Sequence, residues 1–320
     1  MNKNIAKQKK LISIICPVFN EEKAIPLFYE RIQKIIAALT QKYEFDLIFA
    51  NNRSVDKSLE ILCELREKNP SVQILTMSRN FGYQASVQAA LSYASGDGII
   101  VIDVDCEDPP EMIHDFLEQW ENGFDIVYGI RKDREEWWVI KKLRNLFYHL
   151  LRMTADMDIV LYMAEFALIS SHVRDAIINN KNTFPFLRAE IGYAGFSKHG
   201  ITYKRAQREK GKTHYNIFGM VSFGVAGILT SSTFLLRLAG YILPVFVLGN
   251  IILLIMSFYG FAEAFRIMLA INLTYIVSLL TIHGIYLARV YKNAMDRPVF
   301  IIDHKKSYLN NPQSLKTTKS

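Results

Sequence analysis

Residues 98–110, GIIVIDVDCEDPP, join a β-branched apolar run to four carboxylates within six positions. A short apolar run of this kind predicts a buried strand. Because side chains alternate along an extended chain, Asp103 and Asp105 are expected to reach one point at the end of that strand. Two carboxylates so close together repel each other unless a cation or hydroxyl donors lie between them. The alternative is a solvated turn in which Asp108 caps a following helix.

Similar apolar runs alternate with helix-like segments from residue 11 to residue 128. The predicted strands are LISIICPV, FDLIFA, VQILTM, GIIVID and FDIVYG, and the predicted helices cover about 24–43, 56–68, 83–95 and 110–122. Such alternation predicts an α/β domain with a mostly parallel, Rossmann-like sheet that helices cover on both faces.

A polar turn follows each of the first four predicted strands, with the sequences PVFNEE, NNRSVD, SRNFG and DVDCED. Ligands of parallel α/β sheets bind beyond the carboxyl ends of the strands, so four such turns predict one site. The first strand is followed by no GxGxxG, and no strand by a GK[ST] loop, which argues against a dinucleotide-binding or Walker-type domain. The charge of a bound diphosphate would then be met by a cation, and carboxylate ligands suit Mg²⁺ or Mn²⁺.

Two long runs without charged residues, 238–262 and 267–288, each exceed the roughly 20 apolar residues that cross a bilayer. The sequence therefore predicts a transmembrane hairpin with its turn at residues 263–266. Two buried core helices are the alternative. A further uncharged stretch, included in residues 211–237, contains glycines and favours interfacial amphipathic helices.

The segment after the second run, residues 289–320, carries seven basic and two acidic side chains, hence +5 of the chain's net +7. Positively charged flanks stay on the cytoplasmic side, so this tail and the large N-terminal domain are both expected there. The basic residues lie beside the predicted spans, where anionic lipid headgroups explain them better than a nucleic acid would. Cys16, Cys63 and Cys106 lack metal-site spacing and are expected to be reduced thiols.

In order and spacing, six blocks resemble the membrane-anchored polyprenyl-phosphate glycosyltransferases of family 2, which include dolichyl-phosphate mannose synthases and bactoprenol glucosyltransferases. The blocks are CPVFNEE, SRNFGYQAS, IDVDCEDPPE, FDIVYGIRKDR, GKTHYN and YLARVYKNAMDRPVF. The resemblance implies a GT-A catalytic domain at residues 1–210, interfacial helices at 211–237, the transmembrane hairpin at 238–288 and a basic cytoplasmic tail at 289–320.

The same resemblance implies an inverting, metal-dependent transfer of sugar. The donor would be a nucleoside-diphosphate sugar, with UDP favoured and GDP as the alternative, and the acceptor an undecaprenyl or dolichyl phosphate. The expected location is the cytoplasmic leaflet of a bacterial inner membrane, with a homo-oligomer as the expected assembly. Two alternatives stay open: a polysaccharide synthase of the same family, and a catalytically degenerate membrane scaffold.

On the donor side, the resemblance implies that Asp105 ligates the metal and that Asp103 holds the donor or shares the metal. Other donor-binding residues would be Pro17, Asn20, Glu22, Asn52 and Arg79. A surface ion pair is the alternative for Arg79. The family pattern Asp-Asp-Gly-Ser after the second strand is replaced here by residues 51–54, Asn-Asn-Arg-Ser, which leaves the choice of base open.

On the acceptor side, guanidinium groups match the geometry of a phosphate. The candidates for the acceptor phosphate are Arg131, Arg134, Arg208 and Lys212, with Arg131 and Glu165 also expected to serve catalysis. Glu165 stands where the family pattern Gly-Asp-Phe-Arg has its acid, and Ala167 stands where that pattern has its arginine. An alanine cannot replace that cation.

Overall fold

The computed structural model describes residues 9–132, 142, 163–180, 182–206 and 232–310. The chain divides into two compact units. The first consists of residues 1–141, 159–216 and 298–320, and the second of residues 142–158 and 217–297. The first contains the sheet, and the second contains two long helices.

The first unit is built on a seven-stranded sheet in the order β3-β2-β1-β4-β6-β5-β7. β1 is parallel to β2 and β4, β2 to β3, and β5 to β7, whereas β6 is antiparallel to both β4 and β5. The predicted α/β class and mostly parallel sheet are confirmed. The strands are β1 Lys10–Val18, β2 Tyr43–Asn51, β3 Val72–Thr76, β4 Gly98–Val101, β5 Ile126–Lys132, β6 Met163–Ser170 and β7 Lys198–Lys204.

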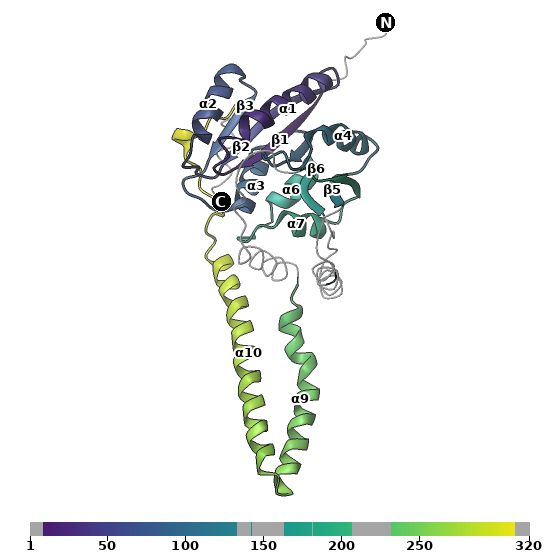
Figure 1. Cartoon of the computed structure of the whole chain (residues 1–320), viewed down its shortest axis with the longest axis vertical. Helices are drawn as coiled ribbons and strands as arrows, with labels where there is room; N and C mark the ends of the chain where they lie inside the picture. The colour runs from purple at the N-terminus through teal and green to yellow at the C-terminus, as the bar shows by residue number, and fades with distance from the viewer. Residues whose placement is uncertain (1–8, 133–141, 143–162, 181, 207–231, 311–320) are drawn as a thin grey trace. The chain divides into compact units, whose positions relative to one another are not determined.

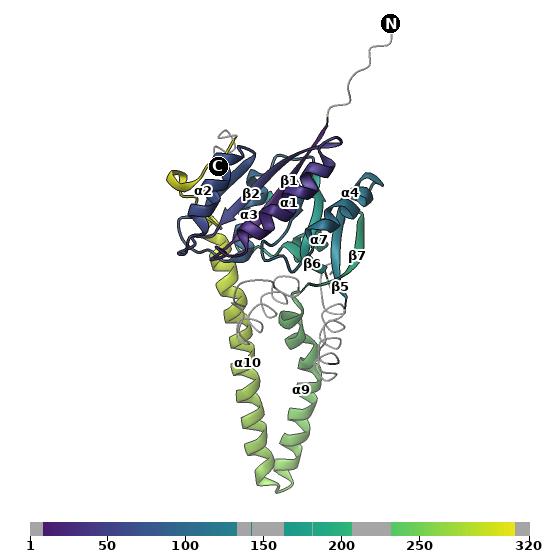
Figure 2. The same cartoon turned by 45° about the horizontal axis from the view of Figure 1, so that its top comes forward.

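Helices cover both faces of this sheet, as predicted. Apolar residues of α1, α2 and α4 pack in one buried cluster, and those of α3, α6 and α7 in the other. Figure 2 shows α1 and α4 lying over one face. The helices are α1 Ile25–Leu39, α2 Ser58–Lys68, α3 Tyr83–Tyr93, α4 Ile113–Glu121, α6 Ser171–Ile178 and α7 Leu187–Ala194, with the short 3₁₀ helix η1 Pro110–Met112 before α4.

The C-terminal segment packs against the sheet beside the edge strand β3, and it lies next to α2 in both views (Figures 1 and 2). Ile302 pairs with Met77, and Tyr308 pairs with Ile74 through hydrogen bonds of 2.9 and 2.7 Å. A short 3₁₀ helix, η2 His304–Lys306, lies between these two pairings. An edge strand exposes unpaired backbone groups, so this segment of the basic tail protects β3.

The second unit contains α9 Phe234–Phe258 and α10 Ala262–Ala294, which run side by side as a hairpin (Figure 1). Both are long and apolar enough to cross a membrane. The predicted turn at residues 263–266 is wrong, because the connection lies at 259–261 and Gly260 there has φ +93°. Glu263 instead occupies the first turn of α10, where the helix dipole favours a negative charge.

The two helices extend beyond the predicted membrane segments. α9 begins at Phe234, inside the segment assigned to interfacial helices, and α10 continues beyond residue 288 to Ala294. Most of the predicted interfacial segment, residues 211–231, lies outside the described residues. Asn272 donates a 2.6 Å hydrogen bond to Asn250 across the hairpin, and such polar contacts stabilise helix pairs in a lipid environment.

Candidate active site

The turns that follow β1 and β2 are held together by hydrogen bonds between their side chains and backbones. The Asn20 amide donates to Ser54 Oγ at 3.0 Å, and Asn20 Oδ1 accepts from the Val55 amide at 2.9 Å. Glu22 Oε2 accepts from the Lys57 amide at 3.2 Å. Asn20 and Glu22 therefore lie at the predicted edge of the sheet, while Pro17 is buried within β1. Their binding of a nucleoside stays a prediction.

The departure at residues 51 and 52 has a structural explanation. Asn51 Oδ1 accepts from the Ser54 amide at 3.0 Å. Asn52 uses both ends of its side chain: Nδ2 donates to Asn80 Oδ1 at 2.9 Å, and Oδ1 accepts from the Phe81 amide at 2.9 Å. A carboxylate could not make the first of these two bonds. Asn52 thus connects the turn after β2 to the loop after β3, and its predicted contact with the donor stays a prediction.

Arg79 lies exposed in the loop after β3. Its guanidinium is 3.8 Å from the centre of the Phe81 ring, and Nη1 donates to the Asn80 carbonyl at 3.1 Å. Within the described part of the chain it forms no ion pair, so the alternative interpretation of Arg79 finds no support there. Stacking on Phe81 holds the cation at the same edge of the sheet as Asn52.

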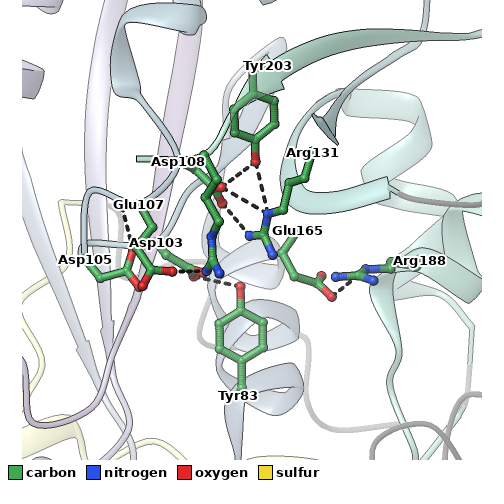
Figure 3. Close-up of polar contacts among 10 residues, drawn as sticks. Tyr83, Asp103, Asp105, Glu107, Asp108, Arg131, Glu165, Arg188 and Tyr203 are labelled. Atoms are coloured by element: carbon green, nitrogen blue, oxygen red, sulfur yellow. Dashed lines mark hydrogen bonds and ion pairs between the residues drawn. The ribbon is translucent and has the colours of Figure 1, made fainter. Parts of the chain in front are cut away.

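The four carboxylates of the opening stretch lie in a turn rather than in a strand, because β4 ends at Val101. The alternation of an extended chain therefore does not place Asp103 and Asp105. Asp103 instead accepts a 2.8 Å hydrogen bond from the Tyr83 hydroxyl, and Asp105 accepts one of 3.1 Å from the Glu107 amide (Figure 3). Cys106, which follows Asp105 in that turn, has φ +59°, a left-handed conformation that is uncommon outside glycine.

The surroundings of Asp103 disfavour its negative charge. Burial, followed by the nearby carboxylates of Asp105 and Asp108, raises the pKa of Asp103 to about 7, against the opposing effects of Tyr83 and Arg131. Burial and the Asp103 carboxylate also raise the pKa of Tyr83. A cation beside Asp103 and Asp105 would relieve this repulsion, and two carboxylate groups are ligands suited to Mg²⁺ or Mn²⁺.

Asp108 has a different environment. The alternative interpretation of the acidic stretch made Asp108 a helix cap, and the structure does not bear this out. Neither η1 nor α4 has a side-chain cap. The Asp108 carboxylate, which is 1% exposed, accepts from Arg131 Nη2 at 2.8 Å and Nε at 3.2 Å, and also from the Tyr203 hydroxyl (Figure 3). A buried carboxylate needs such a partner, since an unpaired charge is costly away from water.

This pairing changes the interpretation of Arg131. Burial by itself would lower the pKa of Arg131, but the adjacent Asp108 carboxylate raises it overall. Its guanidinium therefore stays charged while it supports the acidic turn from β5. Tyr203, on β7, donates to the same carboxylate, and its pKa is raised by burial and by Asp108. Glu107 is paired in turn with Arg205, just after β7.

Glu165 lies on β6 and is 7% exposed. Arg188 Nε of α7 lies 2.9 Å from Glu165 Oε1, and Gln84 Nε2 of α3 donates to the same oxygen at 3.3 Å. Figure 3 shows Glu165 directed towards Arg188, next to the cluster of Asp108, Arg131 and Tyr203. The structure thus brings Glu165, Asp103, Asp105 and Arg131 to one place, whereas Arg134, Arg208 and Lys212 lie outside the described residues.

The residues of this site that were absent from the sequence-based prediction include Tyr83, Arg188, Tyr203 and Arg205. Tyr83 lies in the SRNFGYQAS block and could have been found as the first residue of a helix that starts at the edge of the site. Arg188 lies on α7, Tyr203 lies on β7 and Arg205 follows β7; the alternation of strands and helices in the sequence predicted neither element. Among the described residues, His114, Asp115 and Glu118 also lie close enough to share an ion, but all three are exposed on α4.

Relatives of the chain match it over nearly its whole length. An uncharacterized glycosyltransferase of Bacillus subtilis, YkcC, is 35% identical over 92% of this chain and 94% of its own. A prophage bactoprenol glucosyl transferase homolog of Escherichia coli is 32% identical over 92% of this chain and 99% of its own. The crystal structure of mannosyl-3-phosphoglycerate synthase from Rubrobacter xylanophilus is more distant, with 14% sequence identity and a TM-score of 0.47. The similarity covers 69% of this chain and 72% of that chain.

Residues 13–223 match the family described as glycosyl transferase family 2. This match includes every strand of the sheet except the first residues of β1, together with Asp103, Asp105 and Glu165. The resemblance read from the six sequence blocks is thereby confirmed, and so is the expected glycosyltransferase domain with its mostly parallel α/β sheet. The chain is an enzyme of the glycosyl-transferring class and belongs to glycosyl transferase family 2.

Proposed function

We propose that the protein transfers a sugar from a nucleoside-diphosphate sugar to the phosphate of a polyprenyl lipid, with inversion at the anomeric carbon. The observation that carries the proposal is the acidic turn after β4, where Asp103 accepts from Tyr83 at the start of α3 and Asp105 accepts from the Glu107 amide. Support also comes from relatives named bactoprenol glucosyl transferase, which match over most of their length.

On the donor side, Asp105 and Asp103 would hold a divalent cation. The residues present fit such an ion: both offer carboxylate oxygens, and burial together with the adjacent carboxylates of Asp105 and Asp108 raises the pKa of Asp103. Mg²⁺ typically takes one or two protein carboxylates and completes its coordination with substrate phosphates and water. When bound, the ion would neutralise charge on the departing diphosphate. Asn20, Glu22, Asn52 and Arg79 would line the donor, with UDP as the favoured nucleotide.

On the acceptor side, the lipid phosphate is already an anion, so it needs orientation more than deprotonation. Arg131 supplies a fixed guanidinium, since Asp108 and Tyr203 hold it in place. Arg134, Arg208 and Lys212 are the further proposed contacts for this phosphate. Glu165 lies next to this cluster, with its carboxylate directed towards Arg188, and would orient a hydrogen-bond donor of the bound substrates.

The helical hairpin would anchor the enzyme where its acceptor lies. α9 and α10 expose large apolar side chains along their lengths, as lipid-facing helices do. We assign the protein to a bacterial inner membrane as a multi-pass protein with its catalytic domain on the cytoplasmic side, because the basic residues flank the hairpin. A homo-oligomeric assembly stays a prediction.

The test is direct transfer by the purified full chain in lipid nanodiscs. UDP- and GDP-sugars carrying a radiolabel are supplied with undecaprenyl phosphate and with Mg²⁺ or Mn²⁺. We expect one nucleotide sugar to label the lipid, a product that mild acid releases, and loss of transfer when a chelator replaces the metal. An acid-stable polymeric product, or no transfer from any donor, would overturn the proposal.

A further inference from the structure

The surroundings of Glu165 show how the chain compensates for the missing arginine. Residues 165 and 167 are two apart on β6, so their side chains face the same side of the sheet. Ala167 and its neighbours Met163 and Ile169 pack in the cluster formed with α3, α6 and α7. An arginine at 167 would therefore stand beside the Glu165 carboxylate. Alanine leaves this buried carboxylate to be neutralised from another element.

Arg188, at the start of α7, lies close enough to the Glu165 carboxylate to neutralise it. Its Nε is 2.9 Å from Glu165 Oε1, but the N–H does not point at the oxygen, so the contact is an ion pair without an aligned hydrogen bond. The side chains are 25% and 10% exposed, which leaves little water to screen the charges. Arg188 thus contributes mainly its positive charge.

Gln84 connects the same groups through hydrogen bonds. Its Nε2 donates to Glu165 Oε1 at 3.3 Å, and its Oε1 accepts from the Leu187 amide at 3.0 Å, next to Arg188. The contacts of the carboxylate with Arg188 and Gln84 both use Oε1. Oε2 is buried and has no hydrogen-bond partner among the described residues. A buried oxygen without a partner is costly, so Oε2 is the atom that a bound substrate would satisfy.

We infer that Arg188 is the positioning residue for Glu165, supplying from α7 the positive charge that the family pattern places two residues after the acid, and that Glu165 Oε2 accepts a hydrogen bond from a substrate. The inference rests on the proposed function. Arg188 acts through Glu165 by holding the carboxylate, with Gln84, in the orientation that presents Oε2.

The test compares Arg188→Met with Arg188→Lys in steady-state transfer by the full chain. Arg188→Met is expected to lower kcat about 10- to 100-fold, the range for losing a group that orients a catalytic side chain, and to leave the donor KM within about threefold. Arg188→Lys keeps the charge and is expected to retain at least about one tenth of the wild-type kcat. The matched control is Arg31→Met, which breaks an arginine–glutamate pair with Glu111 outside the site.

A fold defect is separated from misplacement by a second variant. Arg188→Met leaves Glu165 unpaired, whereas Glu165→Gln with Arg188→Met removes both charges and is expected to melt at a higher temperature than Arg188→Met alone. A kcat for Arg188→Met within about threefold of wild type, or equal losses in the Met and Lys variants, would overturn the inference. If wild type hydrolyses a nucleotide sugar but labels no lipid, the proposed acceptor fails, and the same variants are compared on hydrolysis.

Discussion

Two parts of the same acidic turn have opposite surroundings. Asp108 is almost fully buried and is neutralised by Arg131, with a further hydrogen bond from Tyr203. Asp103, five residues earlier, accepts from the neutral hydroxyl of Tyr83 and has two further carboxylates nearby, which help to raise its pKa to about 7. One carboxylate therefore fixes the turn to β5 and β7, and the other lies beside further carboxylates, a setting that a bound cation would stabilise. Crowded acidic residues can serve structure and ligand binding within a single loop.

The largest expected effect in this comparison comes from the part of the turn that we propose binds the metal. Asp105→Asn keeps the size of the side chain but removes its charge, and we expect transfer to fall by about 10³-fold, because the leaving diphosphate loses its electrostatic support. Initial rates of lipid labelling measure this effect. Asp115→Asn, on exposed α4, is the control and should transfer normally. Wild-type rates in Asp105→Asn would contradict the proposed role of Asp105 in holding the cation.

The structural part of the turn should affect stability. Asp108→Ala leaves Arg131 buried without its carboxylate, and we expect the free energy of unfolding to fall by about 3 kcal/mol. Denaturant titration of the solubilised full chain measures the change. Combining Asp108→Ala with Arg131→Met removes both charges and should recover part of the loss. No change in stability for Asp108→Ala would show that the pair is unimportant for the fold.

A further effect on stability should appear in the pH dependence of metal-free protein. Because the pKa of Asp103 is raised from 3.8 to about 7, the folded state holds this proton more tightly than the unfolded chain does. The contribution of Asp103 to the free energy of unfolding is therefore present below pH 3.8 and is lost as the pH rises towards 7. Melting temperatures of wild type and Asp103→Asn, taken with a chelator across this range, should converge at low pH and separate at high pH. Parallel curves of melting temperature against pH for the two proteins would contradict the raised pKa of Asp103.

The smallest effect is expected far from the turn, where the C-terminal segment packs on β3. Asp303 caps η2 by accepting from the Lys305 amide, and it lies 3.6 Å from Arg53 in the turn after β2. Asp303→Ala should lower the free energy of unfolding by about 1 kcal/mol, mostly through the lost cap, since exposed ion pairs contribute little. Asp303→Asn keeps capping ability and should be nearly neutral. Equal losses in both variants would assign the effect to the ion pair.

Local patterns were sufficient for the first half of the domain. The structure contains a strand at each of the five predicted runs, from LISIICPV to FDIVYG. The predicted bounds of the helices between them agree with the structure to within a few residues. β6 and β7 were not predicted, although they complete the sheet. β6 enters antiparallel between β4 and β5, a position that depends on pairing with strands distant in sequence. The turn of the hairpin was misplaced because charged residues were taken as its signal, whereas Gly260 provides the conformation it needs.

The sequence by itself determined the α/β class, the two apolar helices and the edge of the sheet where Asp103 and Asp105 lie, because these follow from periodicity and strand direction. Only the tertiary structure decided which polar side chains are paired. Arg131 with Asp108, Arg188 with Glu165 and Asn52 with Asn80 join residues 23 or more positions apart. Such partnerships arise when separate strands and helices meet, and no local pattern specifies which side chains then face one another.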